Sequence, residues 1–160
     1  MKNSKITLCA IFASLAIVFG YIETLFSVPV AIPGVIWGLG NIVILVALYS
    51  LGKRYAFLIM LIKVLASSLL FASPSVLIYS FFGGVFSFFV MLLLKRFDFN
   101  MVLVSIGGGI SHNIGQLFAA SIMIRTVSVF SYLPVLILSG TVSAVVTGIL
   151  AKIIIKRISL

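Results

Sequence analysis

Five strongly polar side chains stand inside otherwise apolar stretches of this 160-residue chain. They are one ammonium, one imidazole and three carboxamides, and they belong to Asn41, Lys63, His112, Asn113 and Gln116. An ammonium can bind a carboxylate or a phosphate, whereas an imidazole or a carboxamide can hydrogen-bond a polar ring or chain end. Such groups cost free energy at bilayer depth unless they are paired or hydrated. We therefore predict that these five side chains line a mainly apolar pocket for a small molecule.

The chain has few side chains suited to catalysis or to metal binding. The chain has two acidic residues, Glu23 and Asp98, and the apolar pattern places them near opposite faces of a membrane. Carboxylates that cannot share a site cannot perform paired acid–base chemistry or hold magnesium. His112 and Cys9 are the single histidine and cysteine, so no dedicated metal site is expected. The chain is expected to be no enzyme and to carry no cofactor; a porphyrin ligated through His112 is a weaker alternative for the bound molecule.

The composition requires a lipid environment for the elements that position these groups. Hydrophobic residues make up 63% of the chain, charged residues 8%, and the mean hydropathy is +1.41, which excludes a water-soluble core. A helix needs about 20 residues to cross a hydrocarbon layer of about 30 Å. We therefore predict an all-α polytopic membrane protein, a single domain over 1–160 that forms a six-helix transmembrane bundle. Its expected spans are 6–26, 35–52, 55–72, 75–94, 101–124 and 132–155.

Basic residues set the expected orientation. Eleven Lys and Arg residues give a formal charge of +9, and nine of them fall at alternate span ends that share one face: Lys2, Lys5, Lys53, Arg54, Lys95, Arg96, Lys152, Lys156 and Arg157. Basic residues favour the cytoplasmic side, so both termini are predicted to be cytoplasmic in a multi-pass protein of the cell membrane. Orientation and anionic headgroups of the lipid bilayer explain these charges. Nucleic-acid binding is not expected.

Helical geometry predicts which side chains face inward. At about 100° per residue, one narrow stripe of the fifth span holds Ser105, Gly109, His112, Gln116 and Ala119, with Asn113 at its edge. Lys63 shares a stripe with Ser67 in the third span, and Asn41 shares one with Trp37 and Gly38 in the second. Three helices therefore aim polar groups inward, from mid-bilayer toward the outer face.

Other interpretations of these groups stay open. Lys63 could form a structural ion pair, for instance with Glu23, or contact helix carbonyls. Asn41 and Gln116 could simply hydrogen-bond across helices. Glu23 and Arg125 lie near external helix ends, where they are weaker candidates for substrate binding. Two aromatic candidates for stacking on a substrate are also expected to serve as interface anchors: Trp37 and Tyr79.

Small residues recur at four-residue spacing, which favours close helix packing in lipid. The pairs and triplet are Cys9 with Ala13, Ala10 with Ser14, Ser80 with Gly84, and Gly140 with Ala144 and Gly148. Each stripe could pack inside the bundle or dock another membrane subunit. The triplet at 107–109, Gly-Gly-Gly, lacks the Lys-Ser/Thr ending of a nucleotide loop, so close helix approach explains it better. The Pro-rich segment 27–34 is expected to be an extended external crossing that could cover a cavity.

Several segments resemble a known transporter family. The stripe ITLCAIFASLA at 6–16, the Pro-rich external loop and PGVIWGLGNIV at 33–43 resemble the substrate-binding S components of energy-coupling factor transporters. YSFFGG at 79–84 and SIGGGISHNIGQ at 105–116 are similar more narrowly to the Gx transporter group, often labelled heptaprenyl diphosphate synthase component I. The likeness covers almost the whole chain. Prenyl transfer needs aspartate-rich magnesium sites, and the chain has one aspartate, so that label is expected to reflect a neighbouring or partner enzyme.

The resemblance implies a subunit that captures a vitamin-like or cofactor-precursor molecule outside the cell. It further implies delivery of that molecule by toppling against a membrane coupling subunit that two ATPase subunits drive. In that family the first helix meets the coupling subunit through an Ala-x-x-x-Ala pattern, to which Ala10 and Ser14 correspond. An alternative is a non-catalytic accessory membrane subunit of an isoprenoid, quinone or redox complex, in which the polar groups only lock the bundle.

Overall fold

The computed structural model describes residues 2–26, 38–71 and 74–158. Over these residues the chain is all-α, as predicted, and no strand occurs in them. The elements are α1 (Lys2–Phe26), α2 (Leu39–Ser50), α3 (Lys53–Phe71), α4 (Pro74–Arg96), α5 (Met101–Ile124), the 3₁₀-helix η1 (Ser128–Tyr132) and α6 (Leu133–Ile158). The expected external crossing at 27–34 and the candidate Trp37 lie outside the described residues.

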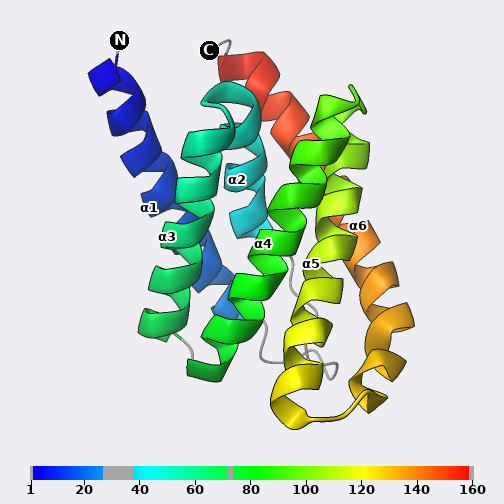
Figure 1. Ribbon diagram of the computed structural model, residues 1–160. Helices are drawn as coiled ribbons and strands as arrows, with labels where there is room; N and C mark the ends of the chain where they lie inside the picture. The colour runs from blue at the N-terminus through cyan, green and yellow to red at the C-terminus, as the bar shows by residue number, and fades with distance from the viewer. Residues whose placement is uncertain (1, 27–37, 72–73, 159–160) are drawn as a thin grey trace.

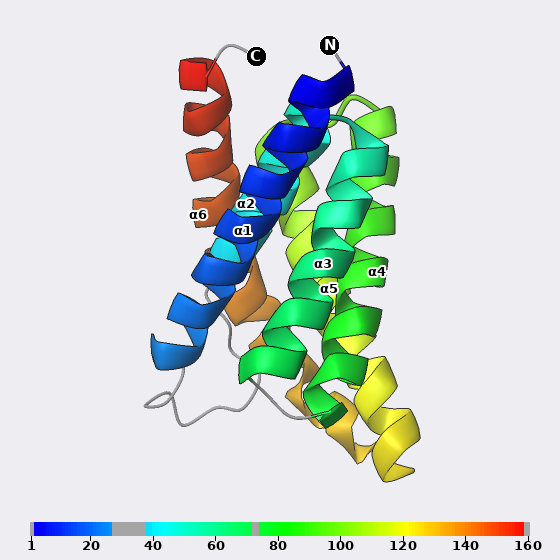
Figure 2. The same cartoon turned by 90° about the vertical axis from the view of Figure 1, so that its left-hand side faces the viewer.

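The helices form a bundle in which α-helices consecutive in the chain run antiparallel (Figure 1). Both termini lie at one end, together with the α2–α3 and α4–α5 turns. Because α3 begins at Lys53, α4 ends at Arg96 and the last turn of α6 holds Lys156 and Arg157, we call this the basic end. The opposite end is called the far end. Figure 2 shows α1 crossing α2 beside α3, and α1 packs against both helices.

Among the residues that the structure describes, four helical segments are long and apolar enough to cross a membrane: Ser4–Glu23, Lys53–Phe71, Pro74–Arg96 and Ser128–Ile158. This supports the prediction of a helical, multi-pass membrane protein. The described part of α2 has 12 residues, and α5 carries glycines and polar residues along much of its length. That α2 and α5 also cross the membrane, and that the termini are cytoplasmic, stay predictions.

The apolar core fills the half of the bundle nearer the basic end. In α2 every residue from Ile42 to Leu48 is buried, because this short helix is packed among α1, α3 and α6. The first half of α1 contributes Phe12, the first half of α3 contributes Ile59, and the last part of α6 contributes Ala151. In the far half, buried apolar side chains such as Leu117 and Leu136 lie among polar ones.

Small residues let α5 approach two neighbours closely. A methyl group added at Gly115 would lie 2.7 Å from the Phe82 carbonyl oxygen of α4. One added at Gly109 would lie 2.9 Å from the Ala144 Cβ of α6. At the basic end, the Asn100 side chain caps α5 by accepting a hydrogen bond from the Leu103 backbone N–H at 2.9 Å. Gly115 and Gly109 thus allow α5 to approach α4 and α6 closely.

Candidate ligand-binding site

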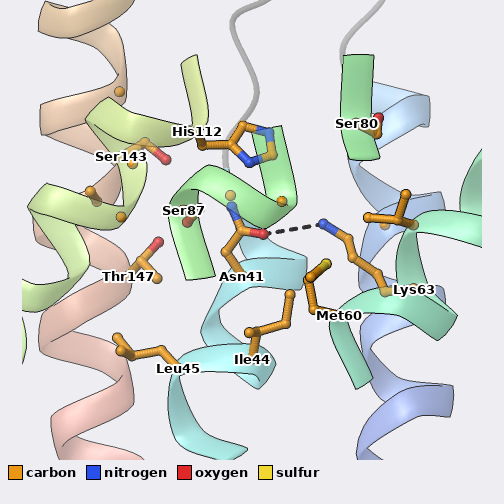
Figure 3. Close-up of a pocket in the computed structure, with 18 of the residues that line it drawn as sticks. Asn41, Ile44, Leu45, Met60, Lys63, Ser80, Ser87, His112, Ser143 and Thr147 are labelled. Atoms are coloured by element: carbon orange, nitrogen blue, oxygen red, sulfur yellow. Dashed lines mark hydrogen bonds between the residues drawn. The ribbon is translucent and has the colours of Figure 1, made fainter. Parts of the chain in front are cut away.

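A cavity of about 170 Å³ lies among the helices, and each of the six described α-helices contributes to its wall. We call it the central cavity (Figure 3). Its lining comes from the late part of α1, the early part of α2 and the middle turns of α3, α4, α5 and α6. It therefore occupies the middle of the bundle and extends toward the far end at Glu23 and Val76. The polar and charged side chains around it are Glu23, Asn41, Lys63, Ser67, Ser68, Ser80, Ser87, Ser105, His112, Asn113, Ser143 and Thr147.

Lys63 reaches the central cavity because two glycines leave room for its long side chain. A methyl group at Gly40 of α2 would lie 2.6 Å from Lys63 Cε, and one at Gly20 of α1 would lie 3.6 Å from the same carbon. The ammonium donates a hydrogen bond to Asn41 Oδ1 at 3.3 Å (Figure 3). Asn41 is thereby oriented by Lys63, and its amide lies between Lys63 on one side and Thr147 on the other.

Glu23 is buried near the end of α1, with 5% of its surface exposed. Its carboxylate accepts a short hydrogen bond from the Leu39 backbone N–H, in the first turn of α2. Carboxylates are stabilised there by the unpaired N–H groups and the positive end of the helix dipole. The same carboxylate attracts the Lys63 ammonium. The central cavity therefore holds one cationic and one anionic side chain, and the anionic one is already bound to backbone.

His112 and Asn113 stand in the middle of α5 with different surroundings. The imidazole lies against the backbone of Gly83 in α4 and faces the central cavity above Asn41 in the view of Figure 3. The Asn113 Nδ2 donates to the Leu136 carbonyl oxygen of α6 at 2.6 Å. Asn113 thus clamps α5 to α6 while it borders the central cavity. The sequence analysis left such a cross-helix hydrogen bond open for Asn41 and Gln116 and did not anticipate it for Asn113.

Hydroxyl groups form most of the polar lining, and the sequence analysis did not identify this property. Ser143 and Thr147 come from α6, a helix for which no polar contribution was predicted. Ser67 Oγ is buried and has no hydrogen-bond partner among the described residues. The available signal was their four-residue spacing, since Ser143 and Thr147 share a face of α6 with Ala144. The stripe named from sequence was the neighbouring one of Gly140, Ala144 and Gly148, and it was interpreted as a surface for packing or for docking another subunit.

The remaining predicted residues lie elsewhere. Gln116 is half-buried, packs its Cγ against Gly83 and does not border the central cavity. Tyr79 is half-buried on α4 outside the lining, and Arg125 is exposed just beyond α5 with φ 55°. Ala10 and Ser14 are exposed on α1. The structure thus brings together Glu23, Asn41, Lys63, His112 and Asn113, and it separates Gln116, Tyr79 and Arg125 from them.

Comparison with known proteins gives a family match over most of the chain. The model of the family described as heptaprenyl diphosphate synthase component I matches residues 12–154. Neither the curated proteins nor the solved structures contain a match. Since the matched range covers far more than half of the 160 residues, the chain belongs to the heptaprenyl diphosphate synthase component I family.

Proposed function

We propose that this chain is the substrate-binding membrane subunit of an importer of the energy-coupling factor type. One observation carries the proposal: all six described α-helices converge on a cavity that contains an ammonium, an imidazole, carboxamides and several hydroxyls. A bundle that needed only to be stable in lipid would fill this volume with apolar or small side chains, because each immersed polar group costs free energy. The polar lining is retained because it recognises a ligand.

The size and chemistry of the central cavity limit the ligand. Its volume of about 170 Å³ is close to that of an engineered cavity of about 150 Å³ that holds benzene. The ligand portion bound there is therefore about one ring in size. Lys63 would bind a carboxylate or phosphate substituent, while His112 and the serines hydrogen-bond polar atoms of the ring. A vitamin-like or cofactor-precursor molecule has this combination of properties.

The position of the central cavity agrees with capture from outside. It extends from the middle of the bundle toward the far end, and no basic residue of the basic end is among its described lining. If the basic end is cytoplasmic, as the positive charges predict, the cavity extends from the middle of the membrane into its outward half. Release to the inside then requires a movement of the whole bundle or of its helices, which an associated machine must drive.

The proposed partners are a membrane coupling subunit and its ATPase subunits. The sequence has no nucleotide-binding motif of its own. Ala10 and Ser14 are exposed on one face of α1, and small residues let a partner helix approach closely. Ser14 Oγ donates to the Ala10 carbonyl oxygen at 3.0 Å, so its hydroxyl is already bonded within α1.

The test is retention of a metabolite by purified protein. Protein in detergent is incubated with cell extract, washed, and its bound small molecules are identified by mass spectrometry. Lys63→Met should lower retention by roughly tenfold or more, because a charged hydrogen bond to the ligand is lost. Lys152→Met, an exposed lysine on α6, is the matched control and should retain wild-type binding. Equal retention by both variants, with both folded by thermal unfolding, would refute the assigned site.

The family description favours one second candidate. A chain of this family could be a non-catalytic membrane subunit that accompanies a prenyl diphosphate synthase. Co-purification from native membranes separates the two functions. Recovery with coupling and ATPase subunits supports import, whereas recovery with a prenyl-transfer enzyme and no bound solute supports the accessory function.

A further inference from the structure

A second pocket lies at the basic end and shares no residue with the central cavity. Its volume is about 550 Å³, and it is lined by Leu48, Lys53, Phe89, Leu92, Leu93, Lys95 and Arg96. We call it the basic pocket. Three of these seven side chains are cationic and the other four are apolar, so the lining offers both a charged part and a lipophilic part.

The cationic part is partly held in place by the fold. Lys95 Nζ donates to the Leu48 carbonyl oxygen at 2.6 Å and lies 4.4 Å from the centre of the Tyr49 ring. An ammonium has three donors, so this contact fixes Lys95 at the end of α2 and leaves donors for a ligand. Lys53 at the start of α3 and Arg96 at the end of α4 are both exposed. The pocket therefore presents three basic groups, one of them already positioned.

None of the seven described residues that line the basic pocket is acidic. The chain has two acidic residues in total. Glu23 belongs to the central cavity at the other end of α1, and Asp98 is exposed in the turn after α4. Asp98 acts electrostatically on Tyr49, against whose ring Lys95 lies, so it offsets part of this charge without lining the pocket. A bound anion would still meet an excess of positive charge from three side chains, and its oxygens suit the fork of an arginine and the donors of two lysines.

The apolar part continues from the charges along α4. Leu93 is about one helical turn and Phe89 about two turns from Arg96, and they are 53% and 58% exposed. Leu92, half-buried, lies beside them. Since α4 is apolar and long enough to span a membrane, exposed side chains at these positions meet acyl chains. A soluble anion would use the charges and leave this wall unused.

We infer that the basic pocket binds an anionic phospholipid, with its phosphate headgroup on Lys53, Lys95 and Arg96 and an acyl chain along Phe89 and Leu93. Charge and apolar surface are arranged in the order in which a lipid presents its headgroup and chain. If the basic end is cytoplasmic, the pocket opens in the leaflet where anionic lipids attract basic residues. The inference rests on the second pocket and does not depend on the ligand of the central cavity.

The experiment measures lipid adducts on the full chain by native mass spectrometry. Delipidated protein in detergent is titrated with phosphatidylglycerol or with phosphatidylcholine of the same chains. Wild type should retain phosphatidylglycerol preferentially. The double variant Lys53→Gln/Arg96→Gln should lose roughly tenfold in apparent affinity, since two phosphate contacts are removed. The control Lys156→Gln/Arg157→Gln removes the same charge from exposed positions at the same end and should bind like wild type.

Two further arms distinguish the possible occupants. The variant Phe89→Ser/Leu93→Ser should retain less phosphatidylglycerol, because it removes the apolar wall along which an acyl chain packs. The fraction of bound lipid that inorganic phosphate displaces should be the same in this variant as in wild type. The lipid assignment would be overturned, and a soluble-anion site identified, if millimolar phosphate displaced all the lipid and the Phe89→Ser/Leu93→Ser variant retained as much lipid as wild type. Equal loss in both charge variants, or equal retention of the two lipids, would overturn it as well. Recovery of a protein with an acidic segment in the pocket, in place of lipid, would also contradict it.

Discussion

Gly40 of α2 and Lys63 of α3 are in direct contact, and the lysine side chain occupies the space that any larger residue at position 40 would need. A methyl group on Gly40 would lie 2.6 Å from Lys63 Cε and 2.9 Å from its Nζ. Real Cβ atoms do not approach other atoms so closely, so one of the two side chains would have to move. The same methyl group would also lie 3.3 Å from the Ala16 carbonyl oxygen of α1. The path of Lys63 into the central cavity therefore depends on a glycine at position 40, where α2 packs closely against both α3 and α1.

Gly40→Ala should displace the Lys63 ammonium and weaken ligand retention. Overpacking of this kind typically costs about 1–3 kcal/mol of folding free energy, and the flexible end of Lys63 allows the lower part of that range. The loss of stability caused by Gly40→Ala should largely vanish in the Lys63→Ala background, in which the colliding side chain is gone. Thermal unfolding of the four members of the cycle in detergent measures the coupling. Additive losses would mean that the two residues do not compete for space.

The features of the fold that could be predicted from sequence are those that the lipid bilayer requires, namely the lengths and apolar exteriors of the helices. A lipid-facing helix needs an apolar exterior over a fixed length, so the ranges of α3 and α4 follow closely from hydropathy. The far half of the bundle was harder to predict. A rotation of about 100° per residue groups His112 with Gln116, yet it does not say which neighbour each meets. Both side chains meet Gly83 of α4, and of the two His112 alone borders the central cavity.

The hydroxyl lining was missed for a related reason. Serine and threonine are small and occur in transmembrane interfaces as packing residues, so Ser143 and Thr147 carry no distinct signal in sequence. Their role appears only when α6 is placed opposite Asn41 (Figure 3). Asn41 and Lys63 were identified because a carboxamide and an ammonium are costly in lipid wherever they face.

Ser67→Ala should separate ligand binding from stability. The buried Ser67 hydroxyl has no hydrogen-bond partner among the described residues, and an unsatisfied polar group opposes folding. Its removal should leave the melting temperature of ligand-free protein unchanged or raise it, while ligand retention falls. Ser50→Ala, which removes the Ser50 Oγ bond to the Val46 carbonyl oxygen at 2.8 Å, should leave ligand retention at the wild-type level. A lower melting temperature for Ser67→Ala would show that its hydroxyl is bonded in the native fold.

Glu23→Gln should tighten binding of an anionic ligand. The amide oxygen can still accept from the Leu39 N–H, so the start of α2 keeps its hydrogen bond. The charge that attracts Lys63 is lost, which leaves the ammonium for the ligand. Glu23→Ala removes the hydrogen bond too and should cost about 1 kcal/mol of stability. Isothermal titration with the identified metabolite, beside thermal unfolding, measures both quantities. Weaker binding in Glu23→Gln would instead show that the carboxylate itself contacts the ligand.

Asn113→Ala should loosen the contact between α5 and α6. The variant removes the 2.6 Å hydrogen bond from Asn113 Nδ2 to the Leu136 carbonyl oxygen, at a position where the side chain is 8% exposed. Loss of a buried hydrogen bond costs about 1–3 kcal/mol, so the melting temperature should fall. Ser139→Ala is the control, because Ser139 Oγ donates to the same carbonyl at 3.3 Å from a half-buried position, and its effect should be smaller. An unchanged melting temperature for Asn113→Ala, with ligand retention abolished, would reassign Asn113 from a clamp between helices to a ligand contact.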